Sequence, residues 1–379
     1  MRRFRIWVLS VLAGMLAACG GSAPVAAPAG SGAAVPSGVS GRAAATGTLA
    51  GLVQGARKEG RLDLVFSEDT IGGAETATEW ADGFNQLYGL NLTVQFTPGP
   101  SMPEMAAKVA QEYATNRPAT TDVFLGAETH IISLLKAEAL QPVDWTSWAT
   151  NVTNPQIIAP GNVAVEVLSA TPGITYNGAK IKAEEAPASL QDLLNPRFKG
   201  HIASTPYTGV FEDLATPEMW GQQRTLDFLK AYSQQVSGLM RSGDIQRLAN
   251  GEFDIMAINT DGSAALRWQA KGVPLQHVVP SDAPFVQFRY MGVPKNSAHP
   301  NAAQLFINYV VSRPGQDILY KHAFSDHYLL PGSHSGAALD RLKASGVALK
   351  ELNVQFVQRN AASMSDAFAK QAAVILAKG

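Results

Sequence analysis

Apolar residues recur at two alternating spacings along residues 49–136. Helical spacing runs from Leu49 to Ala56 and stops near Gly60, and Leu62 to Phe66 then reads as a short strand. The same pattern repeats through a helix around Trp80, Phe84 and Leu87, a strand at 90–96, a helix at 102–113, a strand at 121–125 and a helix through Leu134 and Leu135. Alternating strands and helices at this spacing predict a parallel α/β sheet covered on both faces.

A second α/β region is predicted between Val163 and Val279. We expect strands at 163–168, 201–204, 255–258 and 276–279, and helices at 190–194, 226–235 and 245–250. An extended stretch at 287–293, a helix at 301–311 and a largely helical tail at 339–378 follow. No internal repeat of fixed period is visible.

Polar turns that follow predicted strands are the candidate ligand contacts, because loops at the carboxyl ends of parallel strands gather into one crevice. The alternative for each residue is ordinary turn and helix-capping chemistry. The candidates on such turns are Ser67, Glu68, Asp69, Thr70, Glu128, Thr129, Thr205, Tyr207, Thr208, Asn259, Thr260 and Asp261.

The first residues read as an export signal. Three arginines within the first five residues precede the apolar run Ile6 to Met15, and Leu16-Ala17-Ala18-Cys19 follows. An uncleaved anchor is the alternative, but the run is shorter than the ~20 residues that span a bilayer. The tetrad ending at Cys19 resembles the bacterial lipobox, which implies lipid on Cys19 and cleavage on its amino side. Cys19 is the only cysteine and has no disulfide partner.

Residues 20–47 consist almost wholly of Gly, Ala, Ser, Pro and Val, a composition that predicts a flexible tether. Removal of residues 1–18, which hold three arginines and no acid, changes the formal charge from -1 to -4. A mildly acidic surface argues against nucleic acid as a partner. After the signal, no run is long and apolar enough to cross a membrane.

Motifs of catalysis and metal binding are missing from the sequence. It contains no G-x-S-x-G elbow, no H-E-x-x-H, no Walker loop and no G-x-G-x-x-G after a strand, so we expect neither catalytic residues nor a cofactor. His322, His327 and His334 do not match a common zinc spacing, so we expect structural or surface roles for them and no metal site.

Four stretches, at 52–62, 189–200, 248–255 and 300–316, resemble in order the extracellular solute-binding proteins of bacterial ABC importers, in the branch of ferric-iron, thiamine and phosphonate binders. The resemblance implies two α/β lobes, a ligand cleft between them, hinge closure, and a permease and an ATPase as partners. Asn195-Pro196 and Arg313-Pro314-Gly315 within these stretches read as a turn and a helix stop. Ferric-binding relatives use an adjacent tyrosine pair, which this chain lacks.

The resemblance also bears on two arginines. Arg241 matches a place where relatives present ligand-facing groups at a helix start, a natural anion site; a solvated surface arginine is the alternative. Arg289 and Tyr290 are weaker candidates of the same kind.

Together these features predict a two-lobed fold of the periplasmic-binding-protein type (type II), with mostly parallel sheets, flanking helices and a hinge. The expected parts are a signal at 1–18, lipidated Cys19 and tether at 19–47, lobe 1 at 48–162 and 280–330, and lobe 2 at 163–279 and 331–379. We expect an exported, lipid-anchored monomer facing the periplasm or the cell exterior, which delivers a small polar or anionic solute to an ABC importer. A solute sensor and an exported enzyme are the alternatives.

Overall fold

The computed structural model describes residues 47–344 and 346–376. The predicted signal at 1–18, Cys19 and the tether, apart from Gly47, lie outside the described residues. None of the described helices is long and apolar enough to span a bilayer.

Lobe 1 is built on strands that bury alternate residues. In β1 (Arg61–Phe66), Leu62, Leu64 and Phe66 are buried, and β1 pairs in parallel with β2 (Thr93–Pro98). The long strand β10 (Phe285–Gly292) pairs antiparallel with β3 (Phe124–Gly126) and β4 (Ala164–Ala170), and in parallel with the short β11 (Lys350–Glu351). The helices of this lobe are α1 (Leu49–Glu59), α2 (Ala74–Tyr88), α3 (Met102–Ala114), α4 (Glu128–Lys136), α5 (Trp145–Trp148), α10 (Pro300–Val310) and α11 (Arg313–Ala323).

Local sequence signals set the ends of these helices. The Thr48 hydroxyl accepts a hydrogen bond from the Gly51 amide at 3.2 Å, and Gly60 ends α1 in the left-handed conformation that favours glycine. Arg313-Pro314-Gly315, predicted as a helix stop, instead begins α11. The Ser312 hydroxyl caps that helix by accepting from the Gly315 amide, and proline is tolerated in the first turn because its missing N–H needs no partner there.

Aromatic side chains fill the core of lobe 1. Trp80 and Phe84 of α2 meet Phe306 of α10 edge to face, with ring centroids 5.9 and 5.6 Å apart. Burial of each such side chain contributes roughly 1.5–3 kcal/mol. This packing holds α2 and α10 together although they are far apart in the sequence.

Lobe 2 carries a five-stranded sheet of order β7-β6-β8-β5-β9. Its strands are β5 (Pro172–Asn177), β6 (Ile202–Ser204), β7 (Val236–Leu239), β8 (Ile255–Asp261) and β9 (Leu275–Val278). Its helices are α6 (Phe211–Leu214), α7 (Gln222–Ser233), α8 (Gln246–Ala249) and α9 (Gly262–Gln269), and α12 (His334–Ala344) and α13 (Val354–Leu376) follow later in the chain.

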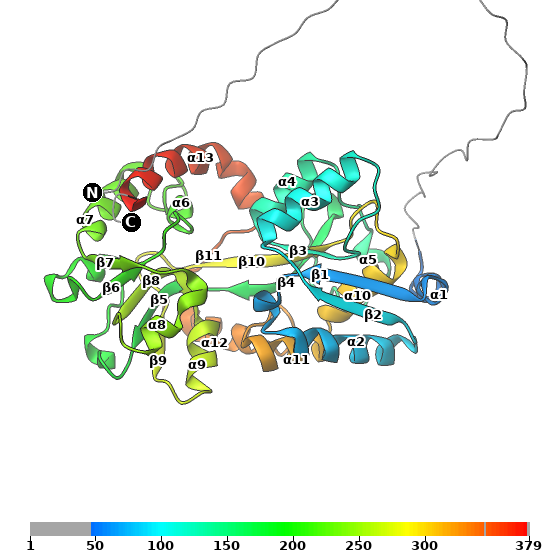
Figure 1. The fold of residues 1–379 in the computed structure, drawn as a ribbon, viewed down its shortest axis with the longest axis horizontal. Helices are drawn as coiled ribbons and strands as arrows, with labels where there is room; N and C mark the ends of the chain where they lie inside the picture. Colours follow the sequence, from blue (N-terminus) through cyan, green and yellow to red (C-terminus); the bar gives the residue numbers. More distant parts are fainter. Residues whose placement is uncertain (1–46, 345, 377–379) are drawn as a thin grey trace, which may run out of the picture. The chain divides into compact units, whose positions relative to one another are not determined.

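The sheets are mixed rather than mostly parallel. Strand β5 pairs antiparallel with β8 and β9, whereas β6 pairs in parallel with β7 and β8. Strands β4 and β10 are antiparallel because the chain runs toward lobe 2 along β4 and returns to lobe 1 along β10 (Figure 1).

The pairing of the crossing strands and the contacts of the tail differ in two places from the expected lobe boundaries. Strand β4 pairs with β10, so the first crossing lies at Thr171 rather than before Val163. The tail is not one helix: α12 and α13 are separated by β11, and α13 packs against α6 and α7 of lobe 2 and also against α4 of lobe 1 (Figure 1). The tail expected in lobe 2 alone therefore contacts both lobes.

A buried polar network ties the crossing strands together. The carboxylate of Glu166 on β4 accepts a hydrogen bond from the Tyr290 hydroxyl at 2.8 Å and lies 2.9 Å from Nε2 of His327. His327 is fully buried and stacks on Phe288 of β10, which gives it the structural role expected from the sequence.

Candidate functional site

A cavity of about 390 Å³ lies between elements of the two lobes. Lobe 1 contributes the start of α4, lobe 2 contributes α6 and the end of β8, and the crossing strand β10 and the C-terminal segment complete the wall. The lining residues are Ala127, Glu128, Thr129, Ala170, Pro172, Gly209, Val210, Glu212, Asp213, Asp261, Gln287, Arg289, Leu352, Val357 and Met364. Its volume suits a small organic molecule.

Glu128, the first residue of α4, is a buried acid in this wall. One carboxylate oxygen accepts a hydrogen bond from the Phe288 amide at 2.5 Å. Burial raises the pKa of Glu128 to about 7, against the opposing attraction of Arg289. Burial, with a further contribution from Arg289, lowers the pKa of the neighbouring His130 to about 4. At pH 7 Glu128 is therefore close to half-protonated and His130 is neutral.

Two acids on α6 lie in the opposite, lobe 2 wall. Asp213 is 5% exposed and accepts a hydrogen bond from the Gln287 side chain at 2.9 Å. Burial, together with the charges of Glu128 and Glu212, raises the pKa of Asp213 well above its ordinary value. Burial also raises the pKa of Glu212, whose carboxylate accepts a hydrogen bond from the Thr208 hydroxyl.

The remaining charged residues of the cavity are Asp261 and Arg289. Asp261 caps α9 through one carboxylate oxygen, which accepts from the amides of Ser263 and Ala264. Arg289 donates from Nη1 to the Phe288 carbonyl at 2.8 Å. Within the described part of the chain, no carboxylate oxygen lies within 4.0 Å of its guanidinium. The described part of the wall thus holds four acids and one base.

Among the expected residues whose side chains the structure describes, Glu128, Thr129 and Asp261 line this cavity. Thr208 reaches it indirectly, through its hydrogen bond to Glu212. Arg289, a weaker candidate, also lines it, whereas Tyr290 points its hydroxyl to Glu166 in the buried network.

The other candidates whose side chains the structure describes lie outside the lining. Ser67, Glu68, Asp69 and Thr70 form or precede a 3-10 helix (Glu68–Ile71) that packs against α2 and α11. Thr205 donates its hydroxyl to the Tyr207 carbonyl within a turn. Asn259 and Thr260 belong to β8. Arg241 is exposed, and its amide donates to the Asp244 carboxylate, so an acid already occupies the position expected for an anion.

Sequence reasoning missed Glu212, Asp213 and Gln287. The adjacent acids Glu212 and Asp213 lie on a helix of four residues, which is too short to show a helical spacing of apolar residues. Gln287 lies on β10, and the pairing of β10 with β4 decides which face of the strand is turned to the cavity. Side chains alternate between the two faces of a strand, so Gln287 lies on the same face of β10 as the candidate Arg289. This alternation is the sequence signal that could have indicated Gln287.

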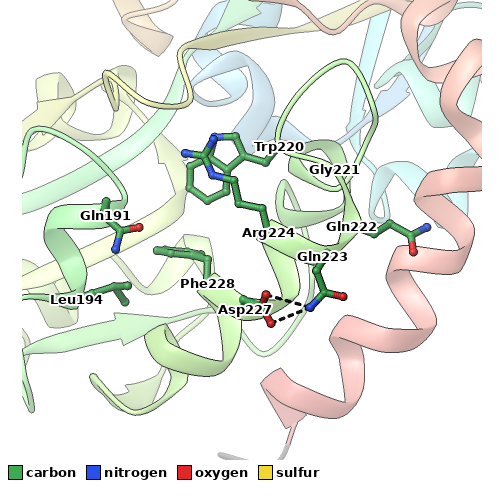
Figure 2. Close-up of a pocket in the computed structure, with 9 residues that line it drawn as sticks. All are labelled: Gln191, Leu194, Trp220, Gly221, Gln222, Gln223, Arg224, Asp227 and Phe228. Carbon is green, nitrogen blue, oxygen red and sulfur yellow. Dashed lines mark hydrogen bonds between the residues drawn. The ribbon is translucent and has the colours of Figure 1, made fainter.

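A second, larger hollow of about 800 Å³ lies along α7, within lobe 2 (Figure 2). In this hollow the Arg224 guanidinium lies 4.2 Å from the centre of the Trp220 ring, and Gln223 donates to both oxygens of Asp227. Since one lobe alone forms this hollow, closure of the lobes would not enclose a ligand there. The cavity between the lobes is therefore the better candidate site.

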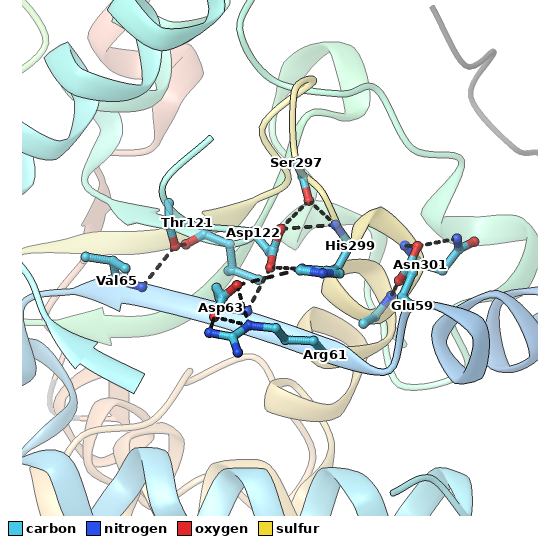
Figure 3. A network of polar contacts seen from close by, with 11 residues as sticks. Glu59, Arg61, Asp63, Val65, Thr121, Asp122, Ser297, His299 and Asn301 are labelled. Atoms are coloured by element: carbon cyan, nitrogen blue, oxygen red, sulfur yellow. Dashed lines mark hydrogen bonds and ion pairs between the residues drawn. The ribbon is translucent and has the colours of Figure 1, made fainter. Parts of the chain in front are cut away.

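Asp63, Asp122 and His299 form a close polar cluster in lobe 1 (Figure 3), with potential ligand atoms within 4.8 Å of one another. Nδ1 of His299 lies 2.7 Å from the Asp122 carboxylate, which also accepts from the Asp63 amide and the Ser297 hydroxyl. These hydrogen bonds occupy the buried carboxylate and join β1 to the segment before α10. These contacts give the cluster a structural role.

Comparisons with known proteins show the family and the fold of the chain. The family described as bacterial extracellular solute-binding protein matches residues 79–346. An Fe(3+)-binding periplasmic protein of Serratia marcescens is 27% identical over 274 residues, which cover 70% of this chain and 78% of that protein.

Solved structures share the fold. The substrate-binding protein of an ABC transporter from Agrobacterium tumefaciens aligns with a TM-score of 0.68 at 17% identity, over 83% of this chain and 95% of that one. Iron-bound HitA from Pseudomonas aeruginosa aligns with a TM-score of 0.63 at 19% identity, over 83% of this chain and 99% of that one. The two-lobed α/β fold expected from the sequence is confirmed.

Proposed function

The chain belongs to the bacterial extracellular solute-binding proteins, and from that premise we propose that it captures a small polar solute between its lobes for an ABC importer. It is a binding protein and not an enzyme. The observation that carries the proposal is the charged cavity whose walls come from both lobes, next to crossing strands that can act as a hinge.

The importer is supported by the Agrobacterium tumefaciens structure, which is the substrate-binding protein of an ABC transporter. Delivery requires that the solute be enclosed and then released, and closure around a ligand supplies both. In this proposal, solute that contacts Glu128 on one side and Asp213 on the other favours the closed arrangement.

Iron is the solute named for the Serratia protein and for HitA. Two observations support a different solute here. No tyrosine is among the described residues that line the cavity. Among the described residues, the cluster of three potential metal ligands lies at Asp63, Asp122 and His299, outside the cavity. We therefore propose an organic solute.

We also propose that lipid on Cys19 holds the protein at the outer side of a membrane. The support is the lipobox-like tetrad before the only cysteine and the Gly- and Ala-rich stretch after it. Cys19→Ser should release the protein into the soluble fraction without changing its affinity for solute. Retention of the variant in the membrane fraction would contradict the anchor.

A thermal-shift screen of the mature protein tests solute capture. Pools of carboxylates, phosphonates, sulfonates, sugars, amines, amino acids and ferric chelates are added after bound solute has been removed by partial unfolding and dialysis. A true ligand should stabilise the folded protein by mass action. The free energy of unfolding should rise by about 2.7 kcal/mol when the free ligand concentration is a hundred times Kd. Absence of a shift with every pool would contradict the proposed function.

A further inference from the structure

The cavity wall has an excess of acid that a purely anionic solute would not balance. Glu128, Glu212, Asp213 and Asp261 face one base, Arg289. Resting on the proposed function, we infer that the captured solute carries a cationic nitrogen group, such as an ammonium or amidinium, which binds among Glu128, Glu212 and Asp213.

Charge and burial support a cation. Glu128 and Asp213 come from different lobes and both are 5% exposed. Glu128 is close enough for its charge to raise the pKa of Asp213. Like charges in a poorly solvated wall disfavour the ionised state. A positive group between them reverses that penalty, because it stabilises both carboxylates as they ionise.

Hydrogen-bonding capacity points to the same group. One oxygen of Asp213 accepts from Gln287, while the other has no hydrogen-bond partner among the residues the structure describes. An ionised carboxylate only accepts hydrogen bonds, and ammonium and amidinium groups only donate them. A nitrogen cation would therefore complete a site that is nearly buried and incomplete without it.

The spacing of the acids distinguishes an organic cation from a bare metal ion. A metal needs several oxygens converging at roughly 2.0–2.6 Å from one point. In the described chain no trio of cavity acids comes within 4.8 Å, since the cluster that meets this distance is the one at His299. A nitrogen cation with several N–H groups reaches more widely spaced carboxylates, and the 390 Å³ cavity leaves room for the rest of the molecule.

Arg289 defines what else the solute can carry. Its guanidinium forms no ion pair with a described carboxylate and presents a planar set of donors. An acid group on the same molecule can pair with it, so zwitterions and simple amines both fit the site. Solutes without any cationic group do not.

The test compares molecules of one skeleton and different charge. Putrescine, γ-aminobutyrate and succinate share four carbons and carry two, one and no ammonium groups. They are run in a thermal-shift screen beside pooled amine-bearing and amine-free metabolites and ferric citrate. We expect shifts from amine-bearing solutes only. The Kd of the best one should rise about tenfold to a hundredfold in Asp213→Asn, because a charge-assisted hydrogen bond is lost.

Asp227→Asn is the matched control, since Asp227 is an exposed acid on α7 outside the cavity. Its Kd should stay within about twofold of the wild-type value. Shifts from succinate, ferric citrate or amine-free pools alone, or an unchanged Kd in Asp213→Asn, would overturn the inference and leave solute capture intact. If no probe shifts the wild-type protein, the proposed function itself fails.

Discussion

Replacement of Glu128 by Gln should remove a pH dependence from the stability of the unliganded protein. Glutamine keeps an oxygen to accept from the Phe288 amide but cannot ionise. Burial raises the pKa of Glu128 from 4.5 to about 7, so between these pH values the folded protein holds a proton that the unfolded chain releases. The resulting stability is fully present below pH 4.5 and is lost as the pH rises through about 7.

The magnitude follows from linkage. The difference between 4.5 and about 7 corresponds to roughly 3 kcal/mol at about 1.36 kcal/mol per pH unit. Only part of this pH range is covered by measurements at about pH 5.5 and pH 8. Between these two values the free energy of unfolding should fall by about 2 kcal/mol more in the wild-type protein than in Glu128→Gln.

Urea unfolding at these two pH values measures the effect, with the free energy of unfolding compared between wild type and variant. Glu184→Gln serves as the control, because Glu184 is exposed on lobe 2. Its pH dependence should match that of the wild type. If Glu128→Gln also keeps the full wild-type dependence, the raised pKa at this site is wrong.

Three further substitutions test the scaffold by chemical denaturation. Glu166→Ala should lower the free energy of unfolding by about 3–5 kcal/mol because it leaves buried partners unsatisfied; a loss below 1 kcal/mol would contradict the role of the network at the crossing strands. Asp122→Ala should lower it by more than about 2 kcal/mol, whereas EDTA should leave the wild-type midpoint unchanged, and an EDTA-sensitive midpoint would indicate a bound ion. Trp80→Ala should lower it by about 3–5 kcal/mol, and a near-neutral result would contradict the packing of α2 on α10.

The fold was largely predictable because apolar spacing reports which faces are buried. Strand β1, helix α3 and helix α10 lie within a few residues of their expected positions. The pattern failed where long-range pairing decides the structure. Strand β7 pairs at the edge of its sheet, and the direction of β10 depends on β3 and β4, which are distant in the sequence.

The candidate site was only partly predictable. Glu128 and Asp261 follow or end strands and were found by the rule that loops at strand ends gather. Glu68 and Asp69 lie in the turn after β1, which packs against α11 and is not part of this lining. Asp213 was missed because its burial depends on α6 and β10 coming together, and no local period encodes that contact.

A crystal structure of the protein with its most stabilising solute tests the central claim most directly. We expect electron density for the solute in the cavity between the lobes, with its nitrogen group in hydrogen-bond contact with Asp213 or Glu128. Density only in the hollow along α7, between Trp220 and Asp227, would contradict solute capture between the lobes.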